Sequence, residues 1–416
     1  MKNVCIIGGG AAGLMSAYAA AENGNKVILF EKNEKLGKKI YITGKGRCNF
    51  TNDVEPAEFS RNIVRGEKFL RGAIYAFSPQ KTISFFENFG LSVKIERGNR
   101  AFPSSDHASD VTKTLEKACK TVGVDIRLNE KVDKIICESG TMSNIGIMSR
   151  VVELQTEKGK YPCDVVIVAT GGLSYPSTGS TGDGYVFAQE LGHSITDLKC
   201  GLCGLNVKEQ FCKDLQGLTL KNVAFCVKSG NKSVYEDFGE MLFTHFGVSG
   251  PIVLSASSVI NRLSMENLTS CIDLKPALDE QTLDKRLLRD FEKYKNKQIA
   301  NALVELLPQK LISVVLLLSG VAASKAVNSL TKEERTRLVK TIKCLPLTLN
   351  GLRGFNEAII TSGGVSLSEI NPKTMGSKKV NGLKFCGEVL DVDAFTGGFN
   401  MQIAFATGYV AGNTIV

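Results

Sequence analysis

The sequence predicts an α/β fold with a parallel sheet, into which an all-β segment and a helical segment are inserted. Short apolar runs that end in glycine-rich turns lie at residues 4–13 and 164–172, as expected of buried parallel strands. Between residues 193 and 272 the chain changes to short strands of alternating polarity. Residues 279–343 have a mostly helical pattern and are charged outside an apolar stripe.

The first apolar run, Val4–Ile7, leads into a turn with the spacing G-x-G-x-x-G. Gly8 is expected to form the tight turn, Gly10 to let the backbone approach a pyrophosphate, and Gly13 to let helix and strand pack closely. The helix expected from Ala11 to Asn23 directs its N-terminal N–H groups and positive dipole end at the phosphates. This turn therefore predicts a diphosphate-binding site.

A second strand completes the dinucleotide-binding pattern. Gly24 ends the helix, and the strand Lys26–Phe30 leads to Glu31, which lies 18 residues after Gly13. An acidic side chain in this place accepts hydrogen bonds from an adenosine ribose. The order of strand, glycines, helix, strand and acid predicts a Rossmann-like domain. Because the site reads both a pyrophosphate and an adenosine ribose, we expect FAD rather than FMN.

A basic, glycine-rich loop follows, from Leu36 to Asn52. Gly44 and Gly46 allow close approach of the backbone, and Arg47 is expected to face a phosphate or the substrate. Lys32 begins a group of lysines and arginines close to the expected diphosphate. The alternative interpretation of the loop is a surface turn rich in glycine and lysine.

Three later positions are expected to extend the site. A strand at residues 124–128 precedes Val132, whose backbone is expected to contact adenine. The last predicted strand ends at Glu388. A helix beginning near Asn400 can present N–H groups to the flavin N1–C2=O edge, where negative charge builds on reduction.

A further buried strand, at residues 164–168, ends in the sequence Ala-Thr-Gly-Gly, which includes Thr170 and Gly171. The glycines between Gly171 and Gly184 have the wrong order for a second G-x-G-x-x-G. The sequence therefore predicts no separate nicotinamide-binding domain. A nicotinamide nucleotide, if it is the electron donor, is expected to dock transiently against the flavin.

Composition bounds the class of protein. The 416 residues carry a net charge of +9, with 43% hydrophobic and 22% charged residues, which is typical of a globular protein of two or three domains. Since Lys and Arg are mostly scattered, with no compact basic run among aromatics, no stable nucleic-acid partner is expected. The 12 cysteines form no disulfide framework, which favours a cytoplasmic location. The apolar run at residues 311–323 is too short to span a membrane.

His245 is one of three histidines and lies between Phe243 and Phe246. A histidine flanked by aromatic residues is more often packed than catalytic, so we expect a structural role. No residue is nominated as a general acid, and the sequence contains no predicted metal site.

Four separated motifs resemble a flavoprotein family. They are the turn at residues 7–13, the sequence Thr-Gly-Lys-Gly-Arg-Cys-Asn at 43–49, Leu-Phe-Thr-His-Phe-Gly at 242–247 and Gly-Glu-Val-Leu-Asp-Val-Asp at 387–393. Together they are similar to the family that includes the bile-acid reductase BaiN and the aminoacetone oxidases, over nearly the whole chain. The resemblance implies an FAD-binding domain built from residues 1–192 and 353–416. It also implies a β-barrel-like domain at 193–275 and 344–352 and a helical subdomain at 276–343.

The resemblance implies FAD contacts at the first turn, at the basic loop and at the C-terminal segment. It places Glu31 at the ribose, Glu388 near the ribityl chain and Asn400–Ile403 at the flavin ring. Combined with the patterns above, the candidate cofactor-binding residues are Gly8, Gly10, Ala12, Gly13, Glu31, Lys32, Gly44, Arg47, Cys48, Asn49, Val132, Thr170, Gly171, Gly387, Glu388, Asn400, Met401 and Ile403.

The resemblance implies an FAD-dependent oxidoreductase that passes a hydride through flavin N5. Its favoured reaction is the NAD(P)H-linked reduction of conjugated C=C bonds in 3-oxo bile acids or steroid-like substrates. A first alternative is an oxidase of a small amine or aminoketone such as aminoacetone. A tRNA-modifying flavoprotein and a non-catalytic flavin-binding protein are alternatives from other classes.

Overall fold

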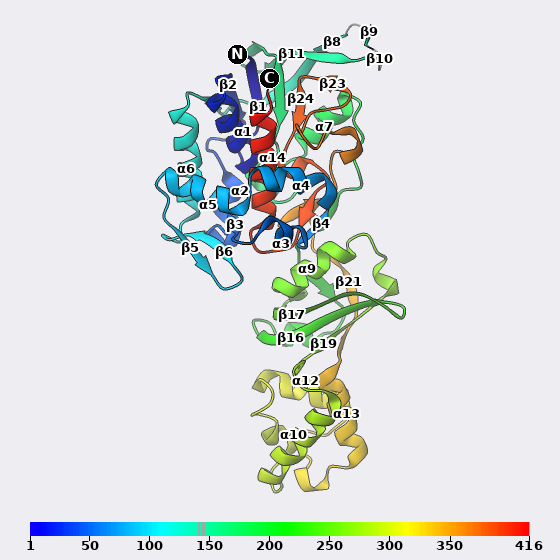
Figure 1. The fold of residues 1–416 in the computed structure, drawn as a ribbon. Coiled ribbons are helices and arrows are strands. Elements are labelled where there is room, and N and C mark those ends of the chain that lie inside the picture. The colour runs from blue at the N-terminus through cyan, green and yellow to red at the C-terminus, as the bar shows by residue number, and fades with distance from the viewer. Residues whose placement is uncertain (140–141, 144–145, 416) are drawn as a thin grey trace. The chain divides into compact units, whose positions relative to one another are not determined.

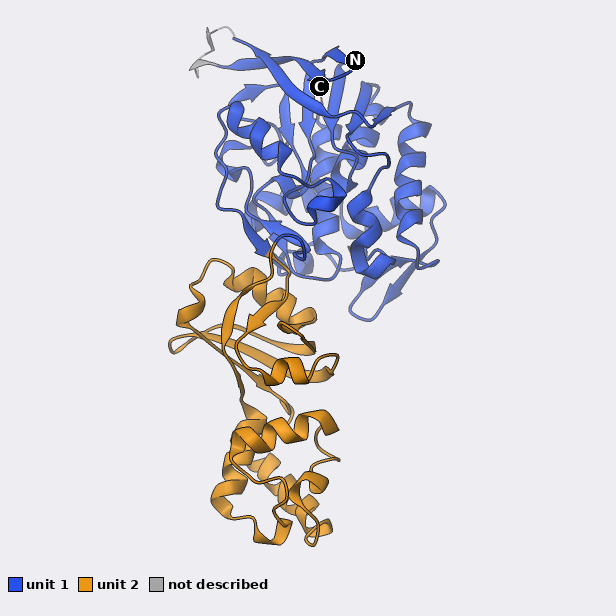
Figure 2. Ribbon diagram, turned by 180° about the vertical axis from the view of Figure 1, so that it is seen from behind, with its two compact units in different colours: residues 1–200, 355–416 blue, residues 201–354 orange. Residues whose placement is uncertain are grey.

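The computed structural model describes residues 1–139, 142–143 and 146–415. The chain divides into two compact units (Figure 2). Unit 1 contains residues 1–200 and 355–416, and unit 2 contains residues 201–354. Unit 2 contains the segment expected to be helical and most of the segment expected to be β-barrel-like, whereas residues 193–200 of the latter lie in unit 1.

Unit 1 is built on a five-stranded sheet with the order β24-β13-β1-β2-β7 (Figure 1). All neighbouring strands are parallel. The strands are β1 (Asn3–Ile7), β2 (Lys26–Glu31), β7 (Asp125–Leu128), β13 (Val165–Val168) and β24 (Leu383–Phe385). The apolar side chains of β1, β13 and β24 are buried because helices cover a parallel sheet on its faces, whereas those of the edge strand β7 are half-buried. The α/β fold predicted from the sequence is confirmed.

Two helices from opposite ends of the chain pack closely beside this sheet. They are α1 (Ala11–Glu22) and α14 (Phe399–Asn413), coloured blue and red in Figure 1. A Cβ on Gly408 would lie 2.4 Å from the Ala12 carbonyl oxygen, and one on Gly412 would lie 2.3 Å from the Ser16 carbonyl oxygen. The two backbones therefore touch with no side chain between them. The C-terminal segment becomes part of the same layer as the first nucleotide-binding turn.

The rest of unit 1 surrounds this layer. Its helices are α2 (Lys38–Ile42), α3 (Pro56–Ser60), α4 (Glu67–Ala76), α5 (Pro79–Asn88), α6 (Ala108–Thr121) and α7 (Asp183–Glu190). Three strands, β3 (Thr51–Asn52), β6 (Arg100–Pro103) and β5 (Val93–Glu96), form a small antiparallel sheet. A second sheet contains β8 (Val132–Glu138), β11 (Ser149–Thr156), β12 (Gly159–Pro162) and β23 (Val380–Asn381).

Unit 2 contains a seven-stranded antiparallel sheet with the order β20-β19-β16-β17-β18-β15-β21. The strands are β15 (Leu205–Val207), β16 (Thr219–Ser229), β17 (Lys232–Thr244), β18 (Gly247–Ser249), β19 (Leu268–Asp273), β20 (Leu345–Leu347) and β21 (Leu349–Leu352). Only Thr348 separates β20 at one edge from β21 at the other. The two edges must therefore be neighbours, which requires the sheet to curl as a barrel does.

The helical part of unit 2 contains α10 (Glu280–Lys293), α11 (Ile299–Ala302), α12 (Gln309–Ser319) and α13 (Lys332–Lys343). Leu283, Leu287, Leu311, Val315 and Leu338 are buried in its core. Asp279 caps α10, and Thr331 with Glu334 forms a capping box at α13, so both helices begin at side-chain caps. Within the described residues, no helix has the length and apolar character that a membrane crossing requires.

A polar network around the buried His193 joins two distant segments of unit 1. Glu369 accepts hydrogen bonds from His193 Nδ1 (3.2 Å), the Ser194 N–H (2.9 Å) and Lys379 Nζ (2.6 Å). Ser377 Oγ lies 2.9 Å from His193 Nε2. Because Glu369 only accepts, the imidazole carries its proton on Nδ1 and accepts from Ser377. Although burial raises the pKa of Glu369, the bonds from Lys379 and Ser194 lower it to about 2.

The Glu369 network predicts a loss of stability in acid. Since the folded pKa lies below the unfolded value, the stabilisation is present above about pH 4.5 and is lost as the pH falls toward 2. Glu369→Gln should lower the free energy of unfolding at neutral pH by about 1–3 kcal/mol and remove this part of the acid dependence. Urea unfolding over this pH range measures both, with Glu87→Gln as an exposed control. Parallel pH profiles for wild type and Glu369→Gln would contradict the assignment.

Candidate functional site

The three glycines of the G-x-G-x-x-G spacing after β1 lie in three different environments. Gly8 has a φ of 107°, and a Cβ there would lie 2.6 Å from the Ala169 carbonyl oxygen. A Cβ on Gly13 would lie 1.8 Å from the Gly8 carbonyl oxygen, so α1 and the turn are in backbone contact. A Cβ on Gly10 would meet no heavy atom within 4 Å. These are the geometries expected of a tight turn, a close helix contact and open space for a ligand.

The N-terminus of α1 opens at Gly10. The first backbone bond of the helix runs from the Leu14 N–H to the Gly10 carbonyl (2.9 Å), so the N–H groups of Ala11, Ala12 and Gly13 have no partner inside the helix. Three unpaired donors and the positive end of a helix dipole favour an anion. Ala12, Gly13 and the open space at Gly10 therefore fit the diphosphate of FAD.

Glu31 ends β2 with its carboxylate held in place. It accepts bonds from the Gly9 N–H (2.8 Å), the Asn33 N–H (2.8 Å) and Asn33 Nδ2 (2.6 Å). A carboxylate has about four acceptor positions, so one remains for a ribose hydroxyl. The Glu130 N–H donates to the Glu31 carbonyl (3.1 Å), which brings the chain near Val132 to the same place. The contacts of Glu31 with ribose and of Val132 with adenine stay predictions.

The C-terminal strand brings a second carboxylate to the same layer. Gly387 has a φ of 75°, and a Cβ there would lie 2.7 Å from the Cβ of Ala12. The next residue, Glu388, accepts bonds from Lys39 Nζ (2.7 Å), Ser174 Oγ (2.7 Å) and the Thr361 N–H (2.8 Å). Burial raises the pKa of Glu388, but Lys39 and these hydrogen bonds lower it overall. Glu388 is therefore an anchored anion with one acceptor position left.

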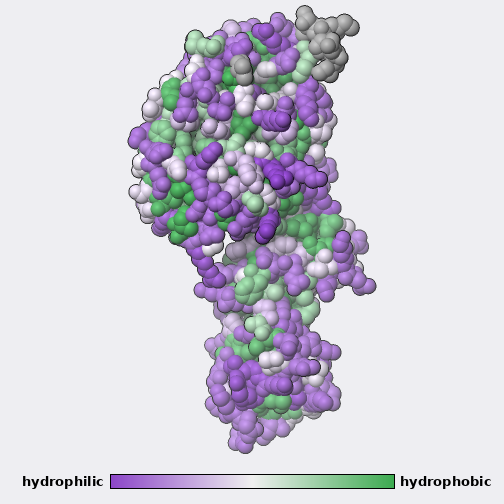
Figure 3. All heavy atoms as spheres, in the orientation of Figure 1, coloured by the Kyte–Doolittle hydropathy of each residue, from purple (hydrophilic) through white to green (hydrophobic). Residues whose placement is uncertain are grey.

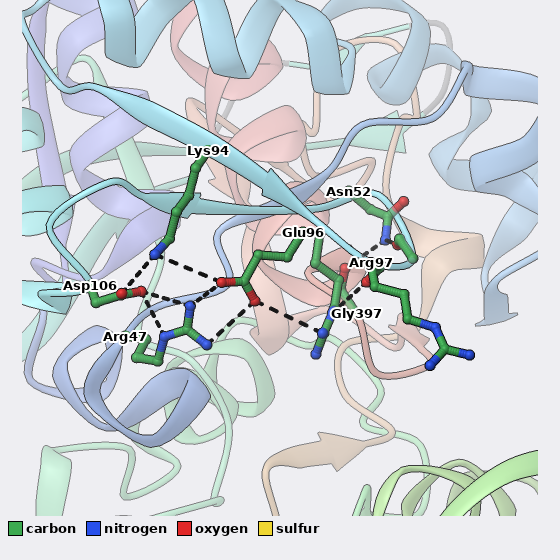
Figure 4. Close-up of polar contacts among 9 residues, drawn as sticks. Arg47, Asn52, Lys94, Glu96, Arg97, Asp106 and Gly397 are labelled. Atoms are coloured by element: carbon green, nitrogen blue, oxygen red, sulfur yellow. Dashed lines mark hydrogen bonds and ion pairs between the residues drawn. The ribbon is translucent and has the colours of Figure 1, made fainter. Parts of the chain in front are cut away.

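The basic loop at residues 43–49 lies against the β5–β6 hairpin (Figure 4). The Arg47 guanidinium pairs with Glu96 and Asp106, the latter at 2.7 Å, and lies 4.4 Å from the centre of the Phe102 ring. Lys94 Nζ also binds Asp106, at 2.6 Å. These bonds raise the pKa of Arg47 and lower those of Glu96 and Asp106. Arg47 thus fastens the loop to the hairpin with its side chain. A phosphate contact by Arg47 stays a prediction.

The same loop has an unusual backbone. Gly44, Lys45, Gly46 and Cys48 all have φ between 59° and 87°. Lys45 and Cys48 are held in the left-handed region, where a side chain is strained. Cys48 is completely buried, and burial raises the pKa of its thiol. Gly44 and Cys48 therefore shape the loop, and any contact they make with FAD is through the backbone.

The N-terminus of α14 lies next to this loop. A Cβ on Gly398 would lie 2.4 Å from the Thr51 carbonyl oxygen and 2.9 Å from Asn49 Oδ1. Asn49 Oδ1 is buried and has no hydrogen-bond partner in the described structure. Asn52 Nδ2 donates hydrogen bonds of 3.0 Å to the carbonyl oxygens of Gly98 in the hairpin and Gly397 before α14, and so connects the two segments. An unsatisfied amide oxygen beside free helix N–H groups fits a polar cofactor edge.

Three candidates on α14 have different surroundings. The Asn400 side chain accepts from the Ala394 N–H (2.9 Å) and donates to the Ala394 carbonyl (2.7 Å). Its backbone N–H lies in the first turn of α14 and has no acceptor within the helix, so it is the group left for a ligand. Met401 is half-buried, and Ile403 is buried in the core one turn further along. The predicted contacts of these residues with the flavin ring are not tested by the structure.

The remaining candidates lie around the end of β13. Lys32 Nζ binds Asp183 Oδ2 (2.6 Å) and Thr181 Oγ1 (2.5 Å). Thr170 Oγ1 is buried without a partner among the described residues. Gly171 has a φ of 73°. Thr170 lies beside Gly8, since a Cβ on Gly8 would be 3.2 Å from the Thr170 Cα. The structure therefore brings Thr170 to the first turn.

Sequence reasoning missed the partners of Glu388 and the role of Asn52. Lys39, Ser174 and Thr361 come from three separate segments, and no local spacing marks them.

The structural role expected for His245 rests on the premise that its side chain packs between aromatic residues, and this premise is wrong. His245 is exposed at the tip of the two-residue β17–β18 turn, with its ring against Phe246 at 5.1 Å. A turn residue between two strands points outward, although its neighbour Phe243 is fully buried.

The fold and the turn geometry define a Rossmann-type dinucleotide-binding domain whose site fits FAD, as in flavin-dependent oxidoreductases. The family model described as "HI0933-like protein Rossmann domain" matches residues 2–414. The chain belongs to this family.

Two relatives with different names match nearly the whole chain. The chain is 33% identical over 419 residues to a 3-dehydro-bile acid delta(4,6)-reductase of Clostridium scindens, covering 99% of this chain and 98% of that protein. It is 31% identical over 415 residues to a ribosomal RNA dihydrouridine synthase of Haemophilus influenzae, covering 99% and 97%. An Escherichia coli protein with the same ribosomal RNA name is 29% identical over 415 residues, covering 99% of this chain and 97% of that protein.

Solved structures share the fold at low sequence identity. A 3-ketosteroid delta1-dehydrogenase from Sterolibacterium denitrificans superposes with a TM-score of 0.54 at 12% identity, covering 99% of this chain and 98% of that one. A 3-ketosteroid-delta4-(5alpha)-dehydrogenase from Rhodococcus jostii superposes with a TM-score of 0.51 at 15% identity, covering 99% of this chain and 95% of that one. These similarities support the architecture.

Gly10→Val should abolish FAD retention while leaving the fold intact. The φ of Gly10 is −86° and no atom lies near its Cβ, so valine fits the apoprotein but fills the space for the diphosphate. We expect FAD affinity to fall by about a hundredfold or more, or about 2.7 kcal/mol, in fluorescence titration of the apoprotein. Gly13→Ala is the contrasting variant and should lower thermal stability, because its Cβ strikes the Gly8 carbonyl. Near-wild-type FAD affinity in Gly10→Val would refute the placement.

His245→Gln should change the free energy of unfolding of the protein by less than about 0.5 kcal/mol, because the side chain is exposed on a turn. Phe243→Ala, two residues away in the core, should cost about 3–5 kcal/mol. Urea unfolding of the two variants makes the comparison. A large loss of stability in His245→Gln would restore the structural role expected from the sequence.

Proposed function

We propose that this protein is an FAD-dependent reductase of C=C bonds conjugated to a carbonyl group. The observation that carries the proposal is the pair of names among its full-length relatives. A delta(4,6)-reductase of 3-dehydro-bile acids and a dihydrouridine synthase differ in substrate but share one reaction class. In both, the double bond that is saturated is conjugated to a carbonyl, so hydride addition to the far carbon places charge on the carbonyl oxygen.

The site supports this proposal through the residues that hold the cofactor. FAD, when bound, supplies a hydride at N5. The open turn at Gly10 and the N–H groups of Ala11, Ala12 and Gly13 would hold the diphosphate, and Glu31 and Glu388 would accept from the ribose and the ribityl chain. The first N–H groups of α14 would favour negative charge at the flavin edge.

For the substrate, the first candidate is a 3-oxo bile acid or a related steroid with conjugated double bonds. The Clostridium scindens relative supports it, with 33% identity over the full length. NAD(P)H is the proposed donor in this reaction. Since the sequence offers one dinucleotide fingerprint, committed to FAD, the donor docks without a domain of its own.

The second candidate substrate is a uridine in RNA. Two relatives named as ribosomal RNA dihydrouridine synthases support it, at 31% and 29% identity over the full length. The C5=C6 bond of uracil is conjugated to the C4 carbonyl, so the same chemistry applies.

Anaerobic reoxidation of the reduced flavin tests the proposal. The protein is reduced with NADH, NADPH or dithionite and mixed with a 3-oxo-4,6-diene bile acid or with a uridine-containing hairpin RNA. We expect fast return of the oxidised flavin spectrum with at least one of them. The matched saturated compounds, a 3-oxo bile acid without these double bonds and an RNA with dihydrouridine, should give none. Flavin reduction by aminoacetone, with reoxidation only by oxygen, would establish the oxidase alternative instead.

A further inference from the structure

The positive charge of the protein is concentrated in the helical part of unit 2. Residues 279–343 contain 13 Lys and Arg against 8 Asp and Glu, which gives +5 of the total +9. The sheet part of the same unit, residues 201–278, contains 7 of each and is neutral. Figure 3 shows the surface of the helical part as mostly hydrophilic. This asymmetry indicates a surface with a specific preference for anions.

One side of helix α13 packs against the rest of the helical part, and the other side is exposed. On one side, Arg335 pairs with Asp284 on α10 (2.6 Å), and Glu334 pairs with Lys325 (2.7 Å). Two buried residues, Leu338 and Ile342, face the core. These contacts fix the position and rotation of the helix within the helical part.

The other side of α13 carries the exposed cations Lys332, Arg337 and Lys340. At about 100° per residue, these three positions lie within an arc of about 140°. None of them has a carboxylate within ion-pair distance among the residues that the structure describes, although Arg337 Nε donates to the Ser319 carbonyl (2.9 Å). Glu333 is the one acidic residue on this face. The face therefore has a net positive charge, which Glu333 offsets only in part.

We propose that this face of α13 (Lys332, Arg337 and Lys340) is a docking surface for the phosphate backbone of RNA. The inference rests on the uridine candidate of the proposed function. RNA presents phosphates at regular intervals, and exposed lysines and arginines on one rigid helix contact them without reading sequence. The cations occur at positions 1, 6 and 9 of the helix, so they form no compact run in the sequence. This is why the sequence alone favoured no nucleic-acid partner.

Salt-dependent RNA binding tests the docking surface. The probe is a fluorescein-labelled hairpin RNA, and its affinity for the FAD-loaded full-length protein is measured by anisotropy at several KCl concentrations. The variant is Lys332→Gln/Arg337→Gln/Lys340→Gln. The matched control, Lys221→Gln/Lys228→Gln/Lys232→Gln, removes the same charge from exposed positions of the sheet part. If each cation contacts one phosphate, the α13 variant should reduce the slope of log K against log salt by about 2–3, and the control should change it little.

The Lys332→Gln/Lys340→Gln variant retains the Arg337 bond to Ser319 and should reduce the slope by about 1.5 if the triple variant is unstable. Equal slopes for the α13 variant and the control would overturn the proposal. Loss of binding to phosphatidylserine vesicles with unchanged RNA binding would overturn it in favour of a membrane surface. Flavin reoxidation by the bile-acid substrate should be unchanged in every variant. The reoxidation assay therefore judges the proposed function separately from the docking surface.

Discussion

The structure depends on direct backbone contact around the first turn. Gly13 meets the Gly8 carbonyl, Gly408 meets the Ala12 carbonyl, and Gly412 meets the Ser16 carbonyl. With no side chains between them, β1, α1 and α14 form one rigid layer, although α1 and α14 come from opposite ends of the chain. This layer fixes the positions of the N-termini of α1 and α14. Among the four glycines of the first turn, Gly10 is the one at which a Cβ would meet open space. An anionic dinucleotide is the ligand that such an arrangement stabilises.

Around this layer, partly exposed ion pairs and hydrogen bonds hold the loops that complete the site. Lys39, Ser174 and Thr361 fix Glu388, while Glu96 and Asp106 fix Arg47 and with it the left-handed backbone of the basic loop. Because these pairs are partly exposed, solvent screens them and each adds little net stability. Their consequence for function is that the polar groups around the cofactor site have fixed positions.

The sequence was sufficient to predict the parallel sheet and the glycine turn, because these depend on local patterns and on spacing. It was insufficient for contacts between distant segments. Lys39 and Glu388 are 349 residues apart, and Arg47 meets Glu96 and Asp106 only because the hairpin folds back on the loop. His245 is exposed because it lies in a two-residue turn. The aromatic residues beside it in the sequence suggest burial instead, so the turn was not recognised. The cations of α13 gather on one face only when the helix forms and its other side is anchored.

The central claim is that reduced FAD in this protein saturates a double bond conjugated to a carbonyl, whatever molecule carries that bond. The most direct measurement is the mass of the substrate after a single anaerobic turnover, with the amount of flavin reoxidised determined in the same sample. The account predicts a product that has gained two hydrogens, in a one-to-one ratio with the flavin oxidised. Reoxidation of the flavin with the substrate mass unchanged would contradict it.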